Sequence, residues 1–386
     1  MKYSLASDTW DEREKEALHK VIESGRYTMG PKVEEFEEKF AKKFGVKNAI
    51  MVNSGSSANL LMIASLVHLG VLKEGQEIIV PAVSWSTTYF PVHQLGLKLV
   101  FVDVDPETLN IDPYDIIPAI TKDTAAILAV NLLGNPCDMQ TLNEICYKNK
   151  IFLLEDNCES LGATYKGKYA GTFGEVGTFS FFFSHHLQTM EGGMIVTNNE
   201  YIAEIIRSMR SHGWTRNLKS DILHKNTGNS FVDSFTFITP GYCLRPLEMS
   251  GAVGCVQLEK MDGMIDMRRK NATYFRESIE QFGTSIQTQK FEPCSNPSWF
   301  GFSMVVDTDR SFFVDLLERN DVETRPIVSG DFTRQPVMKY LNARIEGDLA
   351  CSKKIDRFGL FVGNDSIDIR HKIDHLMTII RIYYDA

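Results

Sequence analysis

The feature that most constrains this fold is a series of short apolar runs separated by segments with helical periodicity. The runs cover residues 77–83, 97–105, 124–134, 151–157, 177–183 and 192–198. Strands that are apolar on both sides must be covered on both faces, as they are in the parallel sheets of α/β proteins. The sequence therefore predicts an α/β fold with a largely parallel sheet between two layers of helices.

The segments between these runs carry helix signals. Pro31 precedes KVEEFEEKFAKKF and Gly45 follows it, which is the usual order of helix start and stop residues. Further helices are expected over 57–69, 113–120, 139–149 and 199–213, the last of them ended by its glycine.

The alternating pattern does not continue to the end of the chain. It lapses into polar, irregular sequence at 215–240, and after Pro246 helical stretches and isolated strands such as 299–307 follow. At 386 residues the chain is also longer than one hydrophobic core usually supports. We therefore predict a larger α/β domain over residues 1–245 and a smaller α+β domain over residues 246–386.

Charge and cysteine usage exclude several classes of function. The chain has 50 acidic and 41 basic residues and a net charge of -9, which argues against general binding to nucleic acid or to anionic membranes. No run approaches the ~18–20 apolar residues of a membrane helix, and the N-terminus lacks a secretory signal. The seven cysteines are widely spaced without a C-x-x-C pair. We expect a cytoplasmic protein with free thiols, no metal and no iron–sulfur cluster.

Three features lie where ligands bind in parallel α/β sheets, at the carboxyl ends of strands. Asp156 ends the run IFLLED, Trp85 follows the run at 77–83, and Gly55 and Ser56 lie at the start of a helix. A helix N-terminus offers free N–H groups to a phosphate. Each feature has an ordinary structural explanation of its own, namely a turn aspartate, a core tryptophan and a helix cap.

Together these residues match the needs of pyridoxal 5'-phosphate (PLP). This cofactor requires a phosphate site, an aromatic ring for stacking and a carboxylate against its ring nitrogen, which keeps that nitrogen protonated. The combination therefore predicts a binding site for PLP or its amine form, pyridoxamine 5'-phosphate.

Over essentially its whole length, the sequence resembles the sugar aminotransferase family of fold-type I PLP enzymes. The matching motifs are SGSSANL, PAVSWSTTYFPV, EDNCESLGATYKGKYAGTFGEVGTFSF, MEGGMIVT and GYCLRPLEMSGAVGCVQLEK. The resemblance implies an aspartate-aminotransferase-like fold in which Asp156 pairs with the pyridine nitrogen and Glu159 lies near the ring oxygen. It also implies that Gly55, Ser56 and Ser180 hold the phosphate.

One position departs from the family pattern. The aminotransferases carry S-F-x-x-x-K, whose lysine holds the cofactor covalently, whereas this chain has Ser180 followed by FFFS and His185. An imidazole cannot hold the aldehyde in this way, but it is a competent general base. The segment SHHLQTMEGG resembles a lysine-less branch of the family that removes the C3 hydroxyl of nucleotide-linked 4-keto-6-deoxy sugars.

The resemblance to this branch implies a substrate of the GDP-mannose series, L-glutamate as amino donor, and ammonia and 2-oxoglutarate as products. The pathway implied is that of 3,6-dideoxysugars such as colitose, for the O-antigen of lipopolysaccharide. In this branch His185 removes the proton from the cofactor's methylene carbon.

Several assignments stay open on the sequence alone. His186 adjoins His185, and a one-residue slip would exchange their roles, although the spacing of the motif favours His185. Cys243 stands where the family has an asparagine that reaches the neighbouring subunit's phosphate group. His212, Arg216 and Arg325 are candidates for binding the glutamate carboxylate or the nucleotide diphosphate.

The irregular segment 215–245 predicts a homodimer, because in this fold type it reaches the neighbouring subunit. Two other functions compete with the dehydratase. The first is a nucleotide-sugar aminotransferase that uses histidine, and the second is a non-catalytic, cofactor-binding regulatory paralogue. A paralogue of the second kind usually loses several site residues, whereas Trp85, Asp156, Glu159 and Ser180 are all present.

Overall fold

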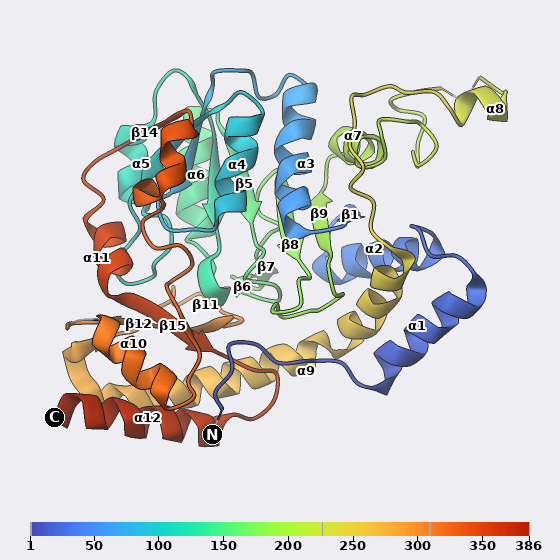
Figure 1. Cartoon of the computed structure of the whole chain (residues 1–386). Helices are drawn as coiled ribbons and strands as arrows, with labels where there is room; N and C mark the ends of the chain where they lie inside the picture. Colours follow the sequence, from blue (N-terminus) through green and yellow to red (C-terminus); the bar gives the residue numbers. More distant parts are fainter. Residues whose placement is uncertain (1, 226, 309, 386) are drawn as a thin grey trace.

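The computed structural model describes residues 2–225, 227–308 and 310–385 and contains a larger and a smaller sheet with their covering helices (Figure 1). Over these ranges the strand order of the larger sheet is β1 (Asn48–Val52), β9 (Gly193–Thr197), β8 (Val176–Ser180), β5 (Phe152–Asp156), β4 (Thr124–Val130), β2 (Glu77–Pro81), β3 (Lys98–Val102) and β14 (Ala343–Ile345). The strands from β8 to β14 are parallel, whereas β9 runs antiparallel to both of its neighbours. The sheet is therefore mixed, with a parallel centre.

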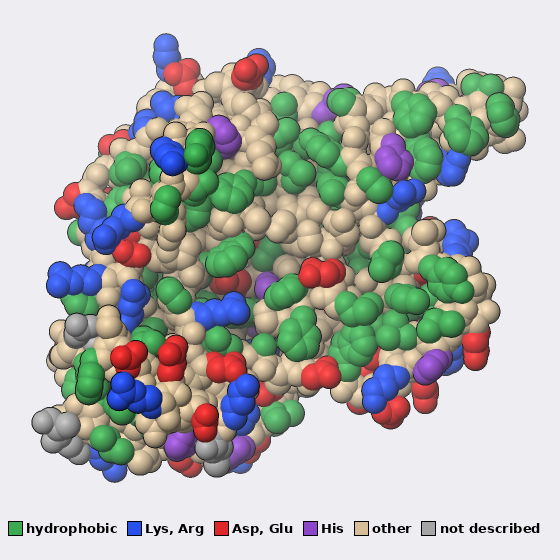
Figure 2. Space-filling view, in the orientation of Figure 1, with side chains coloured by type: hydrophobic (Ala, Val, Ile, Leu, Met, Phe, Trp, Pro, Cys, Tyr) green, Lys and Arg blue, Asp and Glu red, His purple; other side chains and the backbone are tan. Residues whose placement is uncertain are grey.

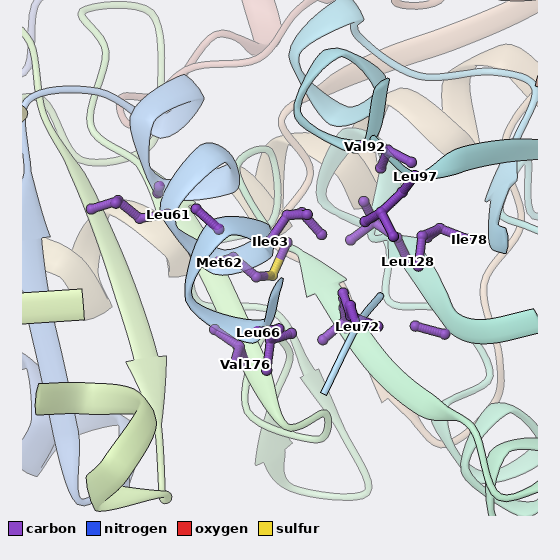
Figure 3. Close-up of a cluster of buried hydrophobic side chains, with 14 of the residues drawn as sticks. Leu61, Met62, Ile63, Leu66, Leu72, Ile78, Val92, Leu97, Leu128 and Val176 are labelled. Atoms are coloured by element: carbon purple, nitrogen blue, oxygen red, sulfur yellow. The ribbon is translucent and has the colours of Figure 1, made fainter. Parts of the chain in front are cut away.

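Helices cover both faces of the larger sheet. One face carries α3 (Gly55–His68), α4 (Ser86–Gln94) and α7 (Glu200–Arg210), and the other carries α2 (Pro31–Phe44), α5 (Pro113–Ala119) and α6 (Met139–Asn149). Figure 3 shows part of the core under α3, where Leu61, Met62 and Ile63 lie in the same cluster as Ile78 and Leu128 of the sheet. Because successive strand residues point to opposite faces, the continuous apolar runs supply both cores.

The smaller sheet is built from strands that follow the long helix α9 (Glu248–Ile279) in the sequence, and it is antiparallel (Figure 1). Its order is β10 (Ile286–Gln287), β12 (Gly301–Val306), β15 (Gly359–Gly363) and β13 (Thr324–Arg325). The remaining elements are α1 (Glu12–Ser24), α8 (Ser230–Asp233), α10 (Arg310–Arg319), α11 (Ala350–Phe358), α12 (Arg370–Asp385), the short strands β6 (Thr164–Tyr165), β7 (Lys168–Tyr169) and β11 (Ser295–Asn296), and the 3₁₀ turns η1 (Leu132–Gly134), η2 (Glu280–Ser285), η3 (Phe332–Arg334) and η4 (Pro336–Tyr340).

The chain crosses between the two sheets more than once. Tyr3, near the N-terminus, is buried in the core of the smaller sheet and donates a hydrogen bond to the Gly363 carbonyl at 2.8 Å. In the other direction, β14 pairs with β3 at the edge of the larger sheet. The predicted domain boundary at 245/246 lies immediately before α9. It stays a prediction, because Tyr3, from before the boundary, packs with the smaller sheet, and β14, from after it, belongs to the larger sheet.

The six apolar runs all contain strands of the larger sheet, and the helices predicted at 57–69, 113–120 and 139–149 are present. The helix expected to end at Gly213 ends at Arg210, because the Ser211 backbone already leaves the helical region there. The sequence did not predict α1, β1 or β14. Position 226 of the irregular segment lies outside the described residues. Over the described ranges, no helix is long and apolar enough to cross a membrane.

Candidate functional site

A cavity of about 340 Å³ lies at the carboxyl ends of the central parallel strands. This volume is in the range of small-molecule sites. Eight residues that the sequence proposed line it: Gly55, Ser56, Trp85, Asp156, Glu159, Ser180, His185 and Arg325. The fold therefore brings together side chains from both sheets at the position where α/β proteins bind ligands.

The N-terminus of α3 forms one end of this cavity. Ser54 caps the helix by accepting a hydrogen bond from the Ser57 N–H at 3.1 Å, so Gly55 and Ser56 contribute the first two amides of the helix. Such amides have no acceptor within the helix and, with the helix dipole, favour an anion. A Cβ on Gly55 would lie 2.6 Å from the Cβ of Ser180, so only glycine lets α3 approach the end of β8 this closely.

The Asp156 carboxylate is buried and held from three sides. Its Oδ2 accepts hydrogen bonds from Asn59 Nδ2 and Thr88 Oγ1, each at 2.8 Å, and its Oδ1 accepts one from the Cys158 N–H at 3.2 Å. These donors fix the carboxylate orientation while the residue lines the cavity. Asp156 can therefore hold a protonated ring nitrogen in place.

Glu159 lies three residues after Asp156 in the sequence and contacts the 3₁₀ turn η1. Its Oε2 accepts a hydrogen bond from the Leu133 N–H at 3.0 Å. Desolvation by burial raises the pKa of Glu159 to about 7. The charge of Asp156 raises this pKa further, whereas the hydrogen bond from Leu133 lowers it. Glu159 can therefore exchange a proton near neutral pH.

Trp85 is the N-cap residue of α4, and 54% of it is exposed in the single chain. A core tryptophan would be buried, so this exposure at the wall of a cavity favours a ring that covers a ligand.

The two adjacent histidines have different environments. His185 lines the cavity, its Nδ1 lies 3.4 Å from Ser184 Oγ, and its ring contacts the Phe300 ring edge-on at a centroid distance of 5.2 Å. His186 is only 1% exposed, its Nε2 lies 3.2 Å from the Ser298 carbonyl oxygen, and it does not line the cavity. The geometry thus favours His185 as the residue available to a ligand.

Burial and the positive charge of Arg268 lower the pKa of His185 to about 4. The imidazole is therefore neutral near pH 7 and able to accept a proton.

The sequence matches the model of the DegT/DnrJ/EryC1/StrS aminotransferase family over residues 8–361. The chain belongs to this family. A relative from Yersinia pseudotuberculosis, "GDP-4-keto-6-deoxy-D-mannose 3-dehydratase", is 47% identical, with 98% of each chain covered. Two solved structures have TM-scores of 0.95 and 47% identity, covering 98% of this chain and 100% of theirs. One is a GDP-4-keto-6-deoxymannose-3-dehydratase with a trapped PLP-glutamate geminal diamine, and the other is a mutant of that enzyme with bound GDP-perosamine.

Membership of the DegT/DnrJ/EryC1/StrS family confirms the predicted aspartate-aminotransferase-like α/β fold. Two of the predicted substrate-binding residues lie elsewhere in the protomer. The His212 ring packs edge-on against Trp214, and the Arg216 guanidinium lies 4.3 Å from the centre of the same ring. Arg216 lines a separate surface depression of about 490 Å³. In the same part of the chain, Cys243 is exposed and accepts a hydrogen bond from Arg245 at 3.5 Å.

Sequence reasoning missed Asn59, Thr88 and Phe300. A polar Asn59 inside the apolar helix SANLLMI was a usable signal, because a buried amide requires a partner. Thr88 lies one turn beyond Trp85 and resembles any polar residue of a helix start. Phe300 gave no signal, since its contact with His185 joins segments that are distant in the sequence.

Proposed function

We propose that this protein is a PLP-dependent nucleotide-sugar 3-dehydratase. It removes the C3 hydroxyl of GDP-4-keto-6-deoxy-D-mannose, with L-glutamate as amino donor, and releases ammonia and 2-oxoglutarate. The dehydratase relative supports the reaction, and the solved structures with GDP-perosamine and with a PLP-glutamate adduct support the two ligand classes. The product belongs to the synthesis of 3,6-dideoxysugars such as colitose, for lipopolysaccharide.

A single observation carries this proposal over aminotransferase activity. Among the described residues that line the cavity there is no lysine, and the resemblance to the family puts its lysine at the position of His185. A neutral imidazole can remove a proton but cannot keep the cofactor covalently attached. The chain therefore retains proton transfer at this position and lacks the amine on which complete transamination usually depends.

The cavity residues fit PLP, which when bound supplies an aldehyde and an electron-accepting ring. The glycine-dependent approach of α3 to Ser180 leaves an amide-lined end for the phosphate, and the held carboxylate of Asp156 suits the ring nitrogen. Trp85 would cover one face of the ring. These are three independent matches between cavity residues and the groups of the cofactor.

Each polar residue then has a defined task. With the cofactor bound, Asp156 would hold a proton on the ring nitrogen, where a positive charge would favour negative charge in the ring. His185 would serve as the base that takes a proton from the cofactor's methylene carbon and could deliver one to the departing C3 hydroxyl. Glu159, with its raised pKa, can hold a proton near the ring oxygen. Arg325, which also lines the cavity, can bind the glutamate carboxylate or a phosphate of the nucleotide.

The experiment incubates purified protein with PLP, L-glutamate and GDP-4-keto-6-deoxy-D-mannose. One ammonia and one 2-oxoglutarate are expected for each 3-deoxy sugar, measured by enzymatic ammonia assay and mass spectrometry. A sugar that carries the amino group, without free ammonia, would refute the dehydratase and favour the aminotransferase.

We further infer that the protein acts as a homodimer. Figure 2 shows hydrophobic side chains gathered over α1, α2 and the projecting segment that carries α8. Exposed members of this surface are Ile22, Tyr27, Phe231, Phe235, Phe237 and Leu247. A second copy would cover them and would bring the segment with His212, Arg216 and Cys243 to the neighbouring cavity. A fully active monomer in analytical ultracentrifugation would contradict this inference.

A further inference from the structure

Among the described residues no carboxylate is hydrogen-bonded to the buried guanidinium of Arg268, on α9, and the charge of Asp365 acts on it only through space. Only 3% of the residue is exposed. Within the described residues its hydrogen bonds go from Nη1 to three backbone carbonyl oxygens, those of Trp299 (3.4 Å), Phe300 (3.3 Å) and Asn364 (3.1 Å). A buried guanidinium that is not neutralised by an ion pair is costly, so its presence calls for a function.

Two of the three carbonyls that Arg268 binds, those of Trp299 and Phe300, belong to a strained turn. Trp299 has φ 46°, in the left-handed region that a bulky residue rarely adopts. The Asn364 side chain supports the same turn, since its Nδ2 donates to the Trp299 carbonyl at 2.9 Å and to the Arg268 carbonyl at 3.1 Å. Arg268 and Asn364 therefore clamp this turn from α9 and from the end of β15.

The clamped turn supports the catalytic histidine directly. The Phe300 ring contacts the rings of His185 and His186, at centroid distances of 5.2 and 5.6 Å, and the Ser298 carbonyl lies 3.2 Å from His186 Nε2. On its other side, the Phe300 N–H donates to the Leu133 carbonyl at 2.9 Å, and the Leu133 N–H binds Glu159. The turn thus links the imidazole of His185 to Glu159 through Leu133.

We propose that Arg268 is a positioning residue for the dehydration. It acts through the Trp299–Phe300 turn that packs against His185, and it places a fixed positive charge behind that ring. This inference rests on the proposed role of His185 as the base. Arg268 does not line the cavity, so it influences the reaction only through the histidine and not by binding substrate.

The charge of Arg268 and its contacts with the turn both favour a neutral His185 that stays in place. The positive charge of Arg268 opposes protonation of His185 and adds to desolvation in lowering its pKa. Among the described residues, the other charged or titratable groups near this ring include His186 on its own loop and the cavity residues Asp156, Cys158, Glu159, Glu191 and Arg325. Removal of Arg268 should therefore free the histidine to take up a proton and to leave its position.

The test uses full-length protein with PLP bound, labelled with [13Cε1]-histidine, in the absence of glutamate and sugar. The His185 signal is assigned by its loss in His185→Asn. In Arg268→Met the NMR pKa of this ring should rise by about one pH unit. Turnover should fall about tenfold with unchanged KM values.

Two variants separate charge from geometry. Arg268→Lys keeps the charge and three donors, so it should keep the low pKa and recover most of the turnover. Asn364→Ala loosens the turn but keeps the charge, so it should lower turnover without a change in the titration. Arg276→Met removes an arginine on the same helix that stacks on Phe291 and should leave both measurements unchanged.

Arg268→Met with wild-type titration and turnover would overturn the proposal. A loss of turnover with an unchanged titration and no recovery by lysine would also overturn it, because that is the result of a purely structural role. If the methionine variant does not fold, wild-type turnover in Asn364→Ala decides against the proposal. The titration is measured without turnover, so it remains a test of Arg268 even if wild-type protein releases no ammonia.

Discussion

Replacement of Gly55 by alanine tests whether the close approach of α3 to β8 forms the phosphate site. The new Cβ would lie 2.6 Å from Ser180 Cβ and 3.0 Å from Cys158 Sγ. Ser180 Cβ is attached to the backbone of β8, so side-chain rotation cannot relieve the contact and the helix must move. Overpacking of this kind costs about 1–3 kcal/mol, and the free energy of unfolding should fall by that amount. Movement of the helix would displace the amides at the start of α3 from the phosphate of PLP. The affinity for PLP should fall about tenfold for each 1.4 kcal/mol of this phosphate–amide interaction that is lost.

The assay measures urea unfolding and, by absorbance titration, the dissociation constant of PLP. The matched control is Gly263→Ala on α9, where an added Cβ meets nothing within 4 Å. Alanine is the better helix former, so this control should be neutral or more stable by up to about 1 kcal/mol, with unchanged PLP affinity. Wild-type stability and PLP affinity in Gly55→Ala would refute the reasoning.

Three further predictions concern the cavity. His185→Asn should still bind PLP but lose ~10²–10⁴-fold in the rate of ammonia release, and His185→Lys should allow borohydride to attach the cofactor covalently, which the wild type should not. Asp156→Asn should keep its fold, by circular dichroism, and lose most turnover; near-native turnover with PLP bound would contradict its role. Because burial raises the pKa of Glu159 from 4.5 to about 7, the folded protein without PLP holds a proton that the unfolded chain releases between these values. This contribution to stability is present below pH 4.5 and is lost as the pH rises through 7, so unfolding of Glu159→Gln should depend less on pH in that range.

The central strands could be predicted because strands that are buried on both faces have continuous apolar sequence. The edges of the sheet could not. β14 is the three-residue segment ARI, too short to show a strand pattern, and its place beside β3 depends on a pairing across more than 200 residues. β9 belongs to an apolar run like the other strands, but it pairs antiparallel with β8. The connection from β8 sets this direction, and the amino-acid composition of the run does not indicate it.

The same distinction applies to the cavity. Residues that contact a ligand themselves, such as Trp85, Asp156 and His185, lie in recognisable local patterns. Residues that act by holding others, such as Thr88 and Arg268, have roles that only the tertiary contacts reveal. The proposed substrate-binding roles of His212 and Arg216 stay predictions, because neither residue lines this cavity in the single chain.

The pairing of β14 with β3 has a consequence for biosynthesis on the ribosome. Until residue 345 has emerged, the edge of β3 presents unpaired backbone N–H and C=O groups, and such an edge is a site for aggregation. The cofactor-binding sheet therefore cannot be closed co-translationally as an independent N-terminal unit. A fragment that ends at residue 245 should be poorly soluble, and a nascent chain of that length is expected to need chaperone protection.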